Sequence, residues 1–362
     1  MNIYFVLEHV SGQGGVETVV TSVARELYSL GHRVIVFLPD ASDNPVWEQL
    51  LPEVHYFFQP KVNISNRFEL IAEKARSFSA TLANFAKPDI LVGTHVPHTT
   101  LYARMATGYV NLPKIPVVSW LHNPPRLFKD PHFINYADVH WAISTGILDE
   151  IKSFIKPSPH IYWVGNPIAI SDQRIHASNQ PQYLVMSRLE NQQKRLDILF
   201  NALAKHPSPW QLHVFGKGPD EDMLKSVAIQ LGINEKIIWE GWVERPWDNI
   251  KTATALVLTS DFEGMPMNIG EAFARGVPVI SSDCHSGPRD LIKHGVNGFL
   301  FPPGDIDSLM QSFRRIESLS DKEWAILSTN ALETSLKFDI HYILQRFKLS
   351  LLDFIHEERW NF

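Results

Sequence analysis

The chain has 362 residues, of which 44% are apolar and 20% are charged. This length is about twice that of a typical single domain, and the composition is that of packed globular proteins rather than of disordered or coiled-coil chains. The formal net charge of −6 argues against a nucleic-acid partner, and the single cysteine, Cys284, excludes an internal disulfide framework. We therefore expect two packed domains, and a reducing compartment is compatible with this composition.

The sequence shows neither a targeting segment nor a membrane-spanning one. The first apolar run, residues 3–7, is too short for a signal peptide, and no run approaches the roughly 20 apolar residues that span a bilayer. The sequence predicts a cytoplasmic protein. Peripheral association with the inner face of the cytoplasmic membrane stays open as an alternative.

Short apolar runs alternate with segments of helical period along the chain. The predicted strands are residues 3–7, 34–38, 90–92, 117–121, 139–143, 161–164, 183–186, 212–215, 237–239, 255–258 and 277–280. The runs are nearly continuous, as in strands buried on both faces, so the pattern predicts an α/β fold of parallel strands with helical crossovers. Because these strands are many for one open sheet, we predict two sheets.

A polar stretch without apolar periodicity follows Gly165-Asn166-Pro167 and runs to Gln182. Such a stretch of turn-forming residues is typical of a domain boundary. We therefore predict a first domain at residues 1–165, a second at 166–340 and a final helix within 341–362.

Two glutamates follow the predicted strand 255–258, in the segment SDFEGMPMNIGEAF. Pro266 suits the first turn of a helix, whose N–H groups could bind phosphate at the carboxyl end of the strand. Glu263 and Glu271 are eight residues apart, about 12 Å along a helix axis, so they cannot share a proton. They could hold opposite ends of a nucleotide-sugar, the sugar at Glu263 and the ribose at Glu271. Two solvated helix acids are the alternative.

Cations and a glycine loop follow two other predicted strands. Arg188 could bind a diphosphate through two hydrogen bonds and Lys194 as a point charge, although a solvated loop is the alternative. Gly14 and Gly15 lie between the first strand and the first helix, where backbone N–H groups can bind an anion. Glu17 occupies the third glycine position of a dinucleotide fingerprint, which disfavours an NAD(P) site.

Asp-x-Asp occurs twice, at Asp220 and at Asp305, in segments that begin helical patterns. N-capping explains both better than a metal-bound diphosphate, so we predict neither a metal nor another cofactor. His122 ends the strand 117–121, where catalytic groups often lie in doubly wound folds. His95 and His98 follow another strand end, where ordinary loop histidines are the favoured interpretation.

In their order along nearly the whole chain, these motifs resemble the retaining glycosyltransferases of family GT4. The set comprises GGVE, Arg188 and Lys194, GKGP at Gly216, GWV at Gly241, the two glutamates, SGP at Ser286, and NGFLFPPGD at Asn297. Ser187 departs from the family, which often has glycine before the arginine. The segments EHVSGQGGVETV, SWLHNPP, WAISTGI and SSDCHSGPRDLI further resemble bacterial lipopolysaccharide-core sugar transferases of the 1,6-galactosyltransferase type.

The resemblance implies the GT-B fold: two Rossmann-like domains facing a cleft, with the final helix crossing back to the first domain. The first domain would bind the acceptor and the second the donor. It implies transfer of a hexose, galactose or glucose, from a UDP-sugar to lipopolysaccharide or another bacterial glycan or glycolipid, with retention and without metal. A nucleotide-sugar epimerase or hydrolase, or an inactive nucleotide-sugar-binding module, stays open.

The resemblance also implies roles for particular residues. The catalytic group would be Glu263, His122, Arg188 and Lys194. Donor contacts would come from Gly14, Gly15, Arg188, Lys194, Val243, Glu263, Met265, Pro266, Met267 and Glu271. His95 and His98 could line the acceptor side.

Overall fold

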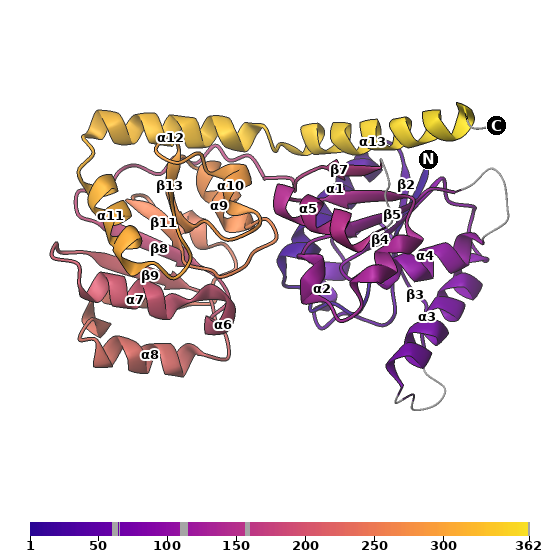
Figure 1. The fold of residues 1–362 in the computed structure, drawn as a ribbon, viewed down its shortest axis with the longest axis horizontal. Helices are drawn as coiled ribbons and strands as arrows, with labels where there is room; N and C mark the ends of the chain where they lie inside the picture. Colours follow the sequence, from indigo (N-terminus) through magenta and orange to yellow (C-terminus); the bar gives the residue numbers. More distant parts are fainter. Residues whose placement is uncertain (60–63, 65, 109–114, 156–159, 361–362) are drawn as a thin grey trace. The chain divides into compact units, whose positions relative to one another are not determined.

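The chain forms two compact units in a computed structural model that describes residues 1–59, 64, 66–108, 115–155 and 160–360, the last five by backbone alone (Figure 1). Unit 1 comprises Met1–Pro167 and Ile340–Phe362, and unit 2 comprises Ile168–Asp339. The sequence pattern places these limits at residues 165 and 340.

Unit 1 is built on a parallel sheet of seven strands in the order β3-β2-β1-β4-β5-β6-β7. Its strands are β1 (Asn2–Val6), β2 (Arg33–Leu38), β3 (Val54–Tyr56), β4 (Ile90–Thr94), β5 (Val117–Leu121), β6 (Val139–Ala142) and β7 (Ile161–Trp163). The order reverses between β1 and β4, which pair with Ile3 opposite Ile90. This switch point matters because doubly wound sheets bind ligands outside the carboxyl ends of such strands.

Helices cover both faces of the unit 1 sheet. They are α1 (Gly15–Ser29), α2 (Pro45–Glu48), α3 (Arg67–Leu82), α4 (Thr99–Thr107), α5 (Thr145–Phe154), α13 (Ile340–Trp360) and the 3₁₀ turns η1 (Pro125–Leu127) and η2 (Pro131–Tyr136). On one face Phe37 of the sheet packs with Phe78 of α3 and Tyr102 of α4. Elsewhere in unit 1 Phe347 of α13 stacks on Trp141 with ring centroids 4.0 Å apart. The last helix therefore completes the core of the unit that contains the N-terminus.

Unit 2 has a parallel sheet of six strands in the order β10-β9-β8-β11-β12-β13. Its strands are β8 (Gln182–Met186), β9 (Gln211–Phe215), β10 (Ile237–Gly241), β11 (Ala255–Leu258), β12 (Val279–Ser282) and β13 (Gly298–Phe301). Its helices are α6 (Asn191–Lys194), α7 (Leu196–Ala204), α8 (Glu221–Gln230), η3 (Asn234–Lys236), η4 (Pro246–Asn249), α9 (Met267–Phe273), α10 (Pro288–Leu291), α11 (Ile306–Glu317) and α12 (Asp321–Leu336). The main core lies between the sheet and α7, α8 and α11, and the strand order reverses between β8 and β11.

The parallel α/β architecture confirms the predicted fold class, but the strand prediction needs three corrections. β3 and β13 were not predicted. β3 is a three-residue edge strand that is only partly buried, and β13 begins with Gly298 and runs into two prolines, so both lack a long apolar run. β12 (Val279–Ser282) ends two residues later than predicted because Ser281 and Ser282, although polar, are buried and pair with β13, and it also starts two residues later.

None of the helices in the described ranges is long and apolar enough to span a bilayer. The longest, α13, buries Phe347 and Phe354 but exposes Leu349 to solvent, as expected of a helix that packs on a core by one face.

Candidate functional site

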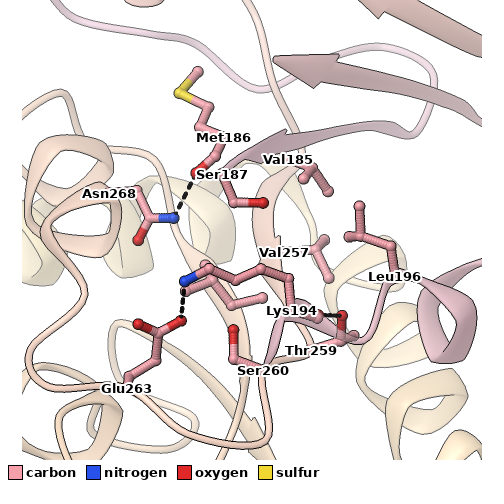
Figure 2. A pocket seen from close by; sticks show the side chains of 11 residues that line it. Val185, Met186, Ser187, Lys194, Leu196, Val257, Thr259, Ser260, Glu263 and Asn268 are labelled. Atoms are coloured by element: carbon pink, nitrogen blue, oxygen red, sulfur yellow. Dashed lines mark hydrogen bonds and ion pairs between the residues drawn. The ribbon is translucent and has the colours of Figure 1, made fainter. Parts of the chain in front are cut away.

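Two ionisable side chains meet at the switch point of unit 2. Lys194 is the last residue of α6, after β8, and Glu263 lies in the turn between β11 and α9. The Nζ of Lys194 lies 2.7 Å from the Oε1 of Glu263, and the two side chains are only 17% and 9% exposed (Figure 2). Because the ammonium has three N–H donors, this bond leaves hydrogen-bonding capacity for a ligand.

The turn that carries Glu263 is held by the SGP motif. The hydroxyl of Ser286 donates to the backbone oxygen of Glu263. Gly287 has φ 95°, and a Cβ on it would lie 2.6 Å from the oxygen of Gly264. Glycine is therefore required for this close approach. Pro266 is the N-cap of α9, one position before the first turn in which the sequence pattern places it.

The GKGP motif packs in the same way against the loop that contains Arg188. A Cβ on Gly216 would collide with the backbone oxygen of Ser187. The N–H of Leu189 donates to the oxygen of Lys217 at 3.0 Å, and the N–H of Gly216 donates to the oxygen of Gly241 at 2.7 Å. The motifs after β8, β9 and β10 thus form one connected set at the carboxyl edge of the sheet.

A cavity of about 10 Å³ lies beside the ion pair, between β8 and β11 (Figure 2). That volume suits about one water molecule. Within the described chain, the Oγ of Ser187 and the Oδ1 of Asn268 are buried here without a hydrogen-bond partner, while the Nδ2 of Asn268 donates to the oxygen of Met186 at 2.8 Å. Asn268 was not predicted; its polar side chain in the first turn of a mostly apolar helix is the signal that could have identified it.

The structure does not bring Arg188 to this pair. Its side chain is 70% exposed, and its NH1 lies 3.6 Å from the Oε2 of Glu190. The assignment of Arg188 to a diphosphate therefore stays a prediction, which needs this guanidinium to turn toward the ligand.

Glu271 has contacts of its own near the end of α9. The Nε1 of Trp247 donates to the Oε2 of Glu271 at 3.0 Å, and the guanidinium of Arg275 lies 5.1 Å from the centre of the Trp247 ring. Burial raises the pKa of Glu271, and the Trp247 hydrogen bond and Arg275 oppose this effect. A partly desolvated carboxylate of this kind suits hydroxyl groups, which donate to it.

The other predicted donor contacts in unit 2 differ in accessibility. Val243 is partly exposed and lines a second cavity of about 290 Å³ with Phe215 and Pro246. Met265 is buried and Met267 is partly buried. Val243 thus adjoins open space, whereas Met265 serves mainly to pack the turn before α9.

In unit 1, Glu17 folds back into the glycine loop. Its Oε1 accepts hydrogen bonds from the N–H of Gly12 and the hydroxyl of Ser11, both at 3.0 Å. A Cβ on Gly14 would lie 2.5 Å from the Oε2 of Glu17. The Glu17 carboxylate therefore packs directly on the glycine loop, and one N–H group of the loop is already bonded to it. Contacts of Gly14 and Gly15 with a donor stay predictions.

The hydrogen bonds of His122 determine its tautomer. Its Nε2 lies 3.1 Å from the Oγ1 of Thr94, and that hydroxyl donates to the oxygen of Trp120 at 2.8 Å. A hydroxyl has one hydrogen to donate, so Thr94 accepts from His122, the proton sits on Nε2, and Nδ1 can accept. Burial lowers the pKa of His122 to about 3. The neutral ring is therefore suited to accept a hydrogen bond from a sugar hydroxyl.

The two Asp-x-Asp segments have structural roles. Asp305 caps α11 by accepting from the N–H of Ser308 at 3.0 Å, as predicted. Asp220 instead accepts from the N–H of Asn191 at 2.7 Å and so holds the start of α6, the helix that ends at Lys194. Among the described residues, no group of three or more His, Cys, Asp and Glu side chains could hold a metal ion.

Two doubly wound units, with a part-buried lysine–glutamate pair at the carboxyl edge of the second, define a glycosyltransferase of the GT-B type. The model of "Glycosyltransferase Family 4" matches residues 13–172, and that of "Glycosyl transferases group 1" matches residues 168–333. The chain belongs to the GT4 family of glycosyltransferases.

Relatives with assigned names are similar over most of their length. The lipopolysaccharide 1,6-galactosyltransferase of Salmonella typhimurium is 36% identical over 330 residues, which are 88% of this chain and 90% of that protein. The Escherichia coli enzyme of the same name is 32% identical over 316 residues, 84% of this chain and 86% of that protein.

Solved structures have the same fold. The apo form of the lipopolysaccharide outer core galactosyltransferase WaaB has a TM-score of 0.85 at 33% identity and covers 98% of this chain and 99% of that chain. Anabaena HepE in complex with UDP has a TM-score of 0.82 at 22% identity and covers 98% of this chain and 100% of that chain, which shows likeness of fold. The predicted family, GT-B fold and enzyme class are confirmed: the protein is a glycosyltransferase.

Proposed function

We propose that the protein transfers a hexose, galactose or glucose, from a UDP-sugar to lipopolysaccharide or another bacterial glycan or glycolipid, with retention of configuration. The observation that carries this proposal is the part-buried Lys194–Glu263 pair at the switch point of unit 2, in a chain similar to lipopolysaccharide galactosyltransferases over most of their length. The HepE complexes with UDP and with UDP-glucose support a UDP-linked donor. A cytoplasmic enzyme that meets a lipid-linked acceptor at the inner face of the cytoplasmic membrane fits this reaction.

The chemical difficulty is the negative charge that develops on the departing phosphate. Lys194 is suited to stabilise this charge because its ammonium is held in place by Glu263 before the donor binds, so little reorganisation is needed during the reaction. Arg188, on the loop that precedes α6, supplies a second cation to the diphosphate. No metal is required in this scheme.

Glu263 has a second carboxylate oxygen, and we assign it to the hydroxyls of the donor sugar, with Glu271 assigned to the ribose and Val243 to the base. His122 accepts from a sugar hydroxyl through Nδ1, and Gly14 and Gly15 add backbone contacts. The acceptor oxygen attacks C1 on the face from which UDP departs. The C1–O bond to phosphate breaks, the new C1–O bond forms, and the acceptor proton passes to the phosphate oxygen, so retention needs no nucleophilic carboxylate.

A panel of donors tests this function. Purified protein is incubated with UDP-galactose, UDP-glucose, GDP-mannose and ADP-glucose, with and without a delipidated lipopolysaccharide core oligosaccharide. We expect acceptor-dependent release of UDP and a product whose new linkage, by NMR, is α, the configuration of the donor. A β-linked product would exclude retention, and equal UDP release without acceptor would indicate a hydrolase.

A further inference from the structure

Arg195 joins α6 to α7 with its backbone in the left-handed region. Its φ is 49° and its ψ is 44°, a conformation that residues with a Cβ enter at a cost. Such a conformation persists only where the surrounding structure stabilises it, and residues of this kind cluster at functional sites. Arg195 directly follows Lys194, so its backbone sets the direction in which the chain leaves α6. The conformation of Arg195 therefore calls for an explanation.

The guanidinium of Arg195 bridges two carboxylates from different elements. Its Nε and NH2 donate to the two carboxylate oxygens of Asp197, in the first turn of α7, at 3.1 and 3.2 Å. Its NH1 donates to the Oδ2 of Asp261, in the segment after β11, at 2.9 Å. The three side chains are 30–37% exposed, and ion pairs as accessible as these contribute little to folding stability. The bridge is therefore better explained by what it holds in place.

Hydrogen bonds also join α6 itself to the segment after β11. The hydroxyl of Thr259 donates to the backbone oxygen of Lys194 at 2.8 Å (Figure 2). The N–H of Asp261 donates to the oxygen of Gln193 at 2.9 Å, and the amide of Gln193 donates to the oxygen of Phe262 at 3.0 Å. These bonds hold the two segments side by side. The guanidinium of Arg195 adds α7 to them, and so relates the direction of α6 to that of the longer helix that follows it.

We propose that Arg195 is a positioning residue that acts through Lys194. By bonding α7 and the segment after β11 at once, its guanidinium fixes α6 so that the ammonium of Lys194 lies against Glu263. This inference rests on the proposed function, which assigns Lys194 to the departing phosphate. The four-residue helix α6 is too short to be stable alone, so its direction depends on such contacts. A displacement of about 1 Å in a catalytic group can lower a rate about 100-fold.

Two substitutions of Arg195 separate its guanidinium from its backbone conformation. Arg195→Gly removes the bridge and accepts a φ of 49°, so the fold should be kept. Arg195→Lys keeps the positive charge and can bond one carboxylate, but it lacks the planar fork that bonds both. Asp261→Ala removes the other end of the bridge. Lys225→Ala is the matched control, because it breaks an ion pair with Glu221 of 2.6 Å on α8, elsewhere in unit 2.

We expect Arg195→Gly to lower kcat about tenfold and to change the KM for UDP-galactose or UDP-glucose little. The charge of Lys194 stays near the diphosphate in this variant but is no longer held in place when the phosphate departs. Arg195→Lys should recover part of kcat, and Lys225→Ala should behave like the wild-type protein. Because both substitutions break one bridge, the double variant Arg195→Gly/Asp261→Ala should be no slower than the slower single variant. An unchanged kcat in Arg195→Gly, or losses that multiply in the double variant, would overturn the proposal.

Chemical labelling separates this proposal from the transferase function itself. If the wild-type protein neither binds nor turns over a nucleotide-sugar, the proposed function fails. Acetylation by acetic anhydride without nucleotide, measured for each lysine by peptide mass spectrometry, still decides the role of Arg195. The Lys194 amine is 17% exposed and paired with Glu263, so it should react slowly in the wild-type protein and several times faster in Arg195→Gly, with Lys225 unchanged. Equal reactivity of Lys194 in the two proteins refutes the proposal.

Discussion

At the scale of the residue, Lys194 combines a part-buried ammonium with N–H donors that its bond to Glu263 leaves unused. We expect Lys194→Gln to weaken UDP binding about tenfold and to lower turnover about 100-fold, because the positive charge opposite the departing phosphate is lost. Glutamine keeps an N–H for Glu263 and avoids leaving that carboxylate unpaired. Calorimetry and steady-state kinetics measure both effects, with Lys225→Gln, on the exposed face of α8, as control. Unchanged UDP affinity in both Lys194→Gln and Arg188→Ala would contradict the assignment of these cations.

Glu271 illustrates a conflict between stability and binding. Burial raises the pKa of its carboxyl, so keeping the negative charge at pH 7 costs folding free energy. The Nε1 of Trp247 needs only a hydrogen-bond acceptor, which an uncharged side-chain oxygen also supplies. We expect Glu271→Gln to stabilise the protein by about 1 kcal/mol and to weaken UDP binding about tenfold. Thermal unfolding and calorimetry test this, with 2′,3′-dideoxy-UDP as the matched ligand. If the variant loses as much affinity for the dideoxy compound as for UDP, Glu271 does not contact the ribose.

At the scale of the element, substitutions at two glycines distinguish the cost of a left-handed backbone from the effect of a steric clash on the site. Gly287 and Gly295 have φ 95° and 75°, but only a Cβ on Gly287 would meet other atoms, those of Gly264 and Pro266. Alanine at Gly295 should cost about 1–2 kcal/mol of folding free energy, since its backbone is left-handed. Alanine at Gly287 should cost more, because its Cβ also meets backbone atoms. Only Gly287→Ala should also lower turnover, more than tenfold, because it displaces the turn that carries Glu263. Denaturant unfolding and kinetics check this, and equal turnover in the two variants would show that the turn needs no such support.

The helices and strands also show how much of the structure the sequence alone predicts. Continuous apolar runs predicted most strands, and because Lys194 and Glu263 each follow a strand of one parallel sheet, their convergence at its carboxyl edge could be inferred. The bond between these two side chains could not be inferred. The direction of Lys194 depends on the turn at Arg195, a residue other than glycine whose φ is 49°. The sequence could not predict the hydrogen bonds between Glu17 and its own loop for the same reason. Local loop geometry, rather than residue type or spacing, selects the partner.

At the scale of the whole molecule, groups with pKa values shifted by burial or pairing are concentrated in unit 1. Burial lowers the pKa of His122 to about 3 and that of His140 to about 4, and pairing with His98 and Lys74 lowers that of Glu8 to about 2 against the opposing effect of burial. A histidine with a folded pKa below its unfolded value of 6.5 stays neutral when folded but binds a proton when unfolded. Folding stability is therefore present above pH 6.5 and is lost as the pH falls toward the folded pKa. Glu8 adds to this loss only below about pH 4.5.

We expect unit 1 to lose more stability than unit 2 between pH 7 and pH 5, by up to about 2 kcal/mol for each of the two histidines. Denaturant-dependent hydrogen exchange with peptide-level mass spectrometry measures the two units separately. His140→Gln removes one titration without touching the proposed substrate contacts, so the dependence of unit 1 stability on pH should become weaker. Parallel loss in both units, or an unchanged dependence in His140→Gln, would show that these buried imidazoles do not control the acid sensitivity of the protein.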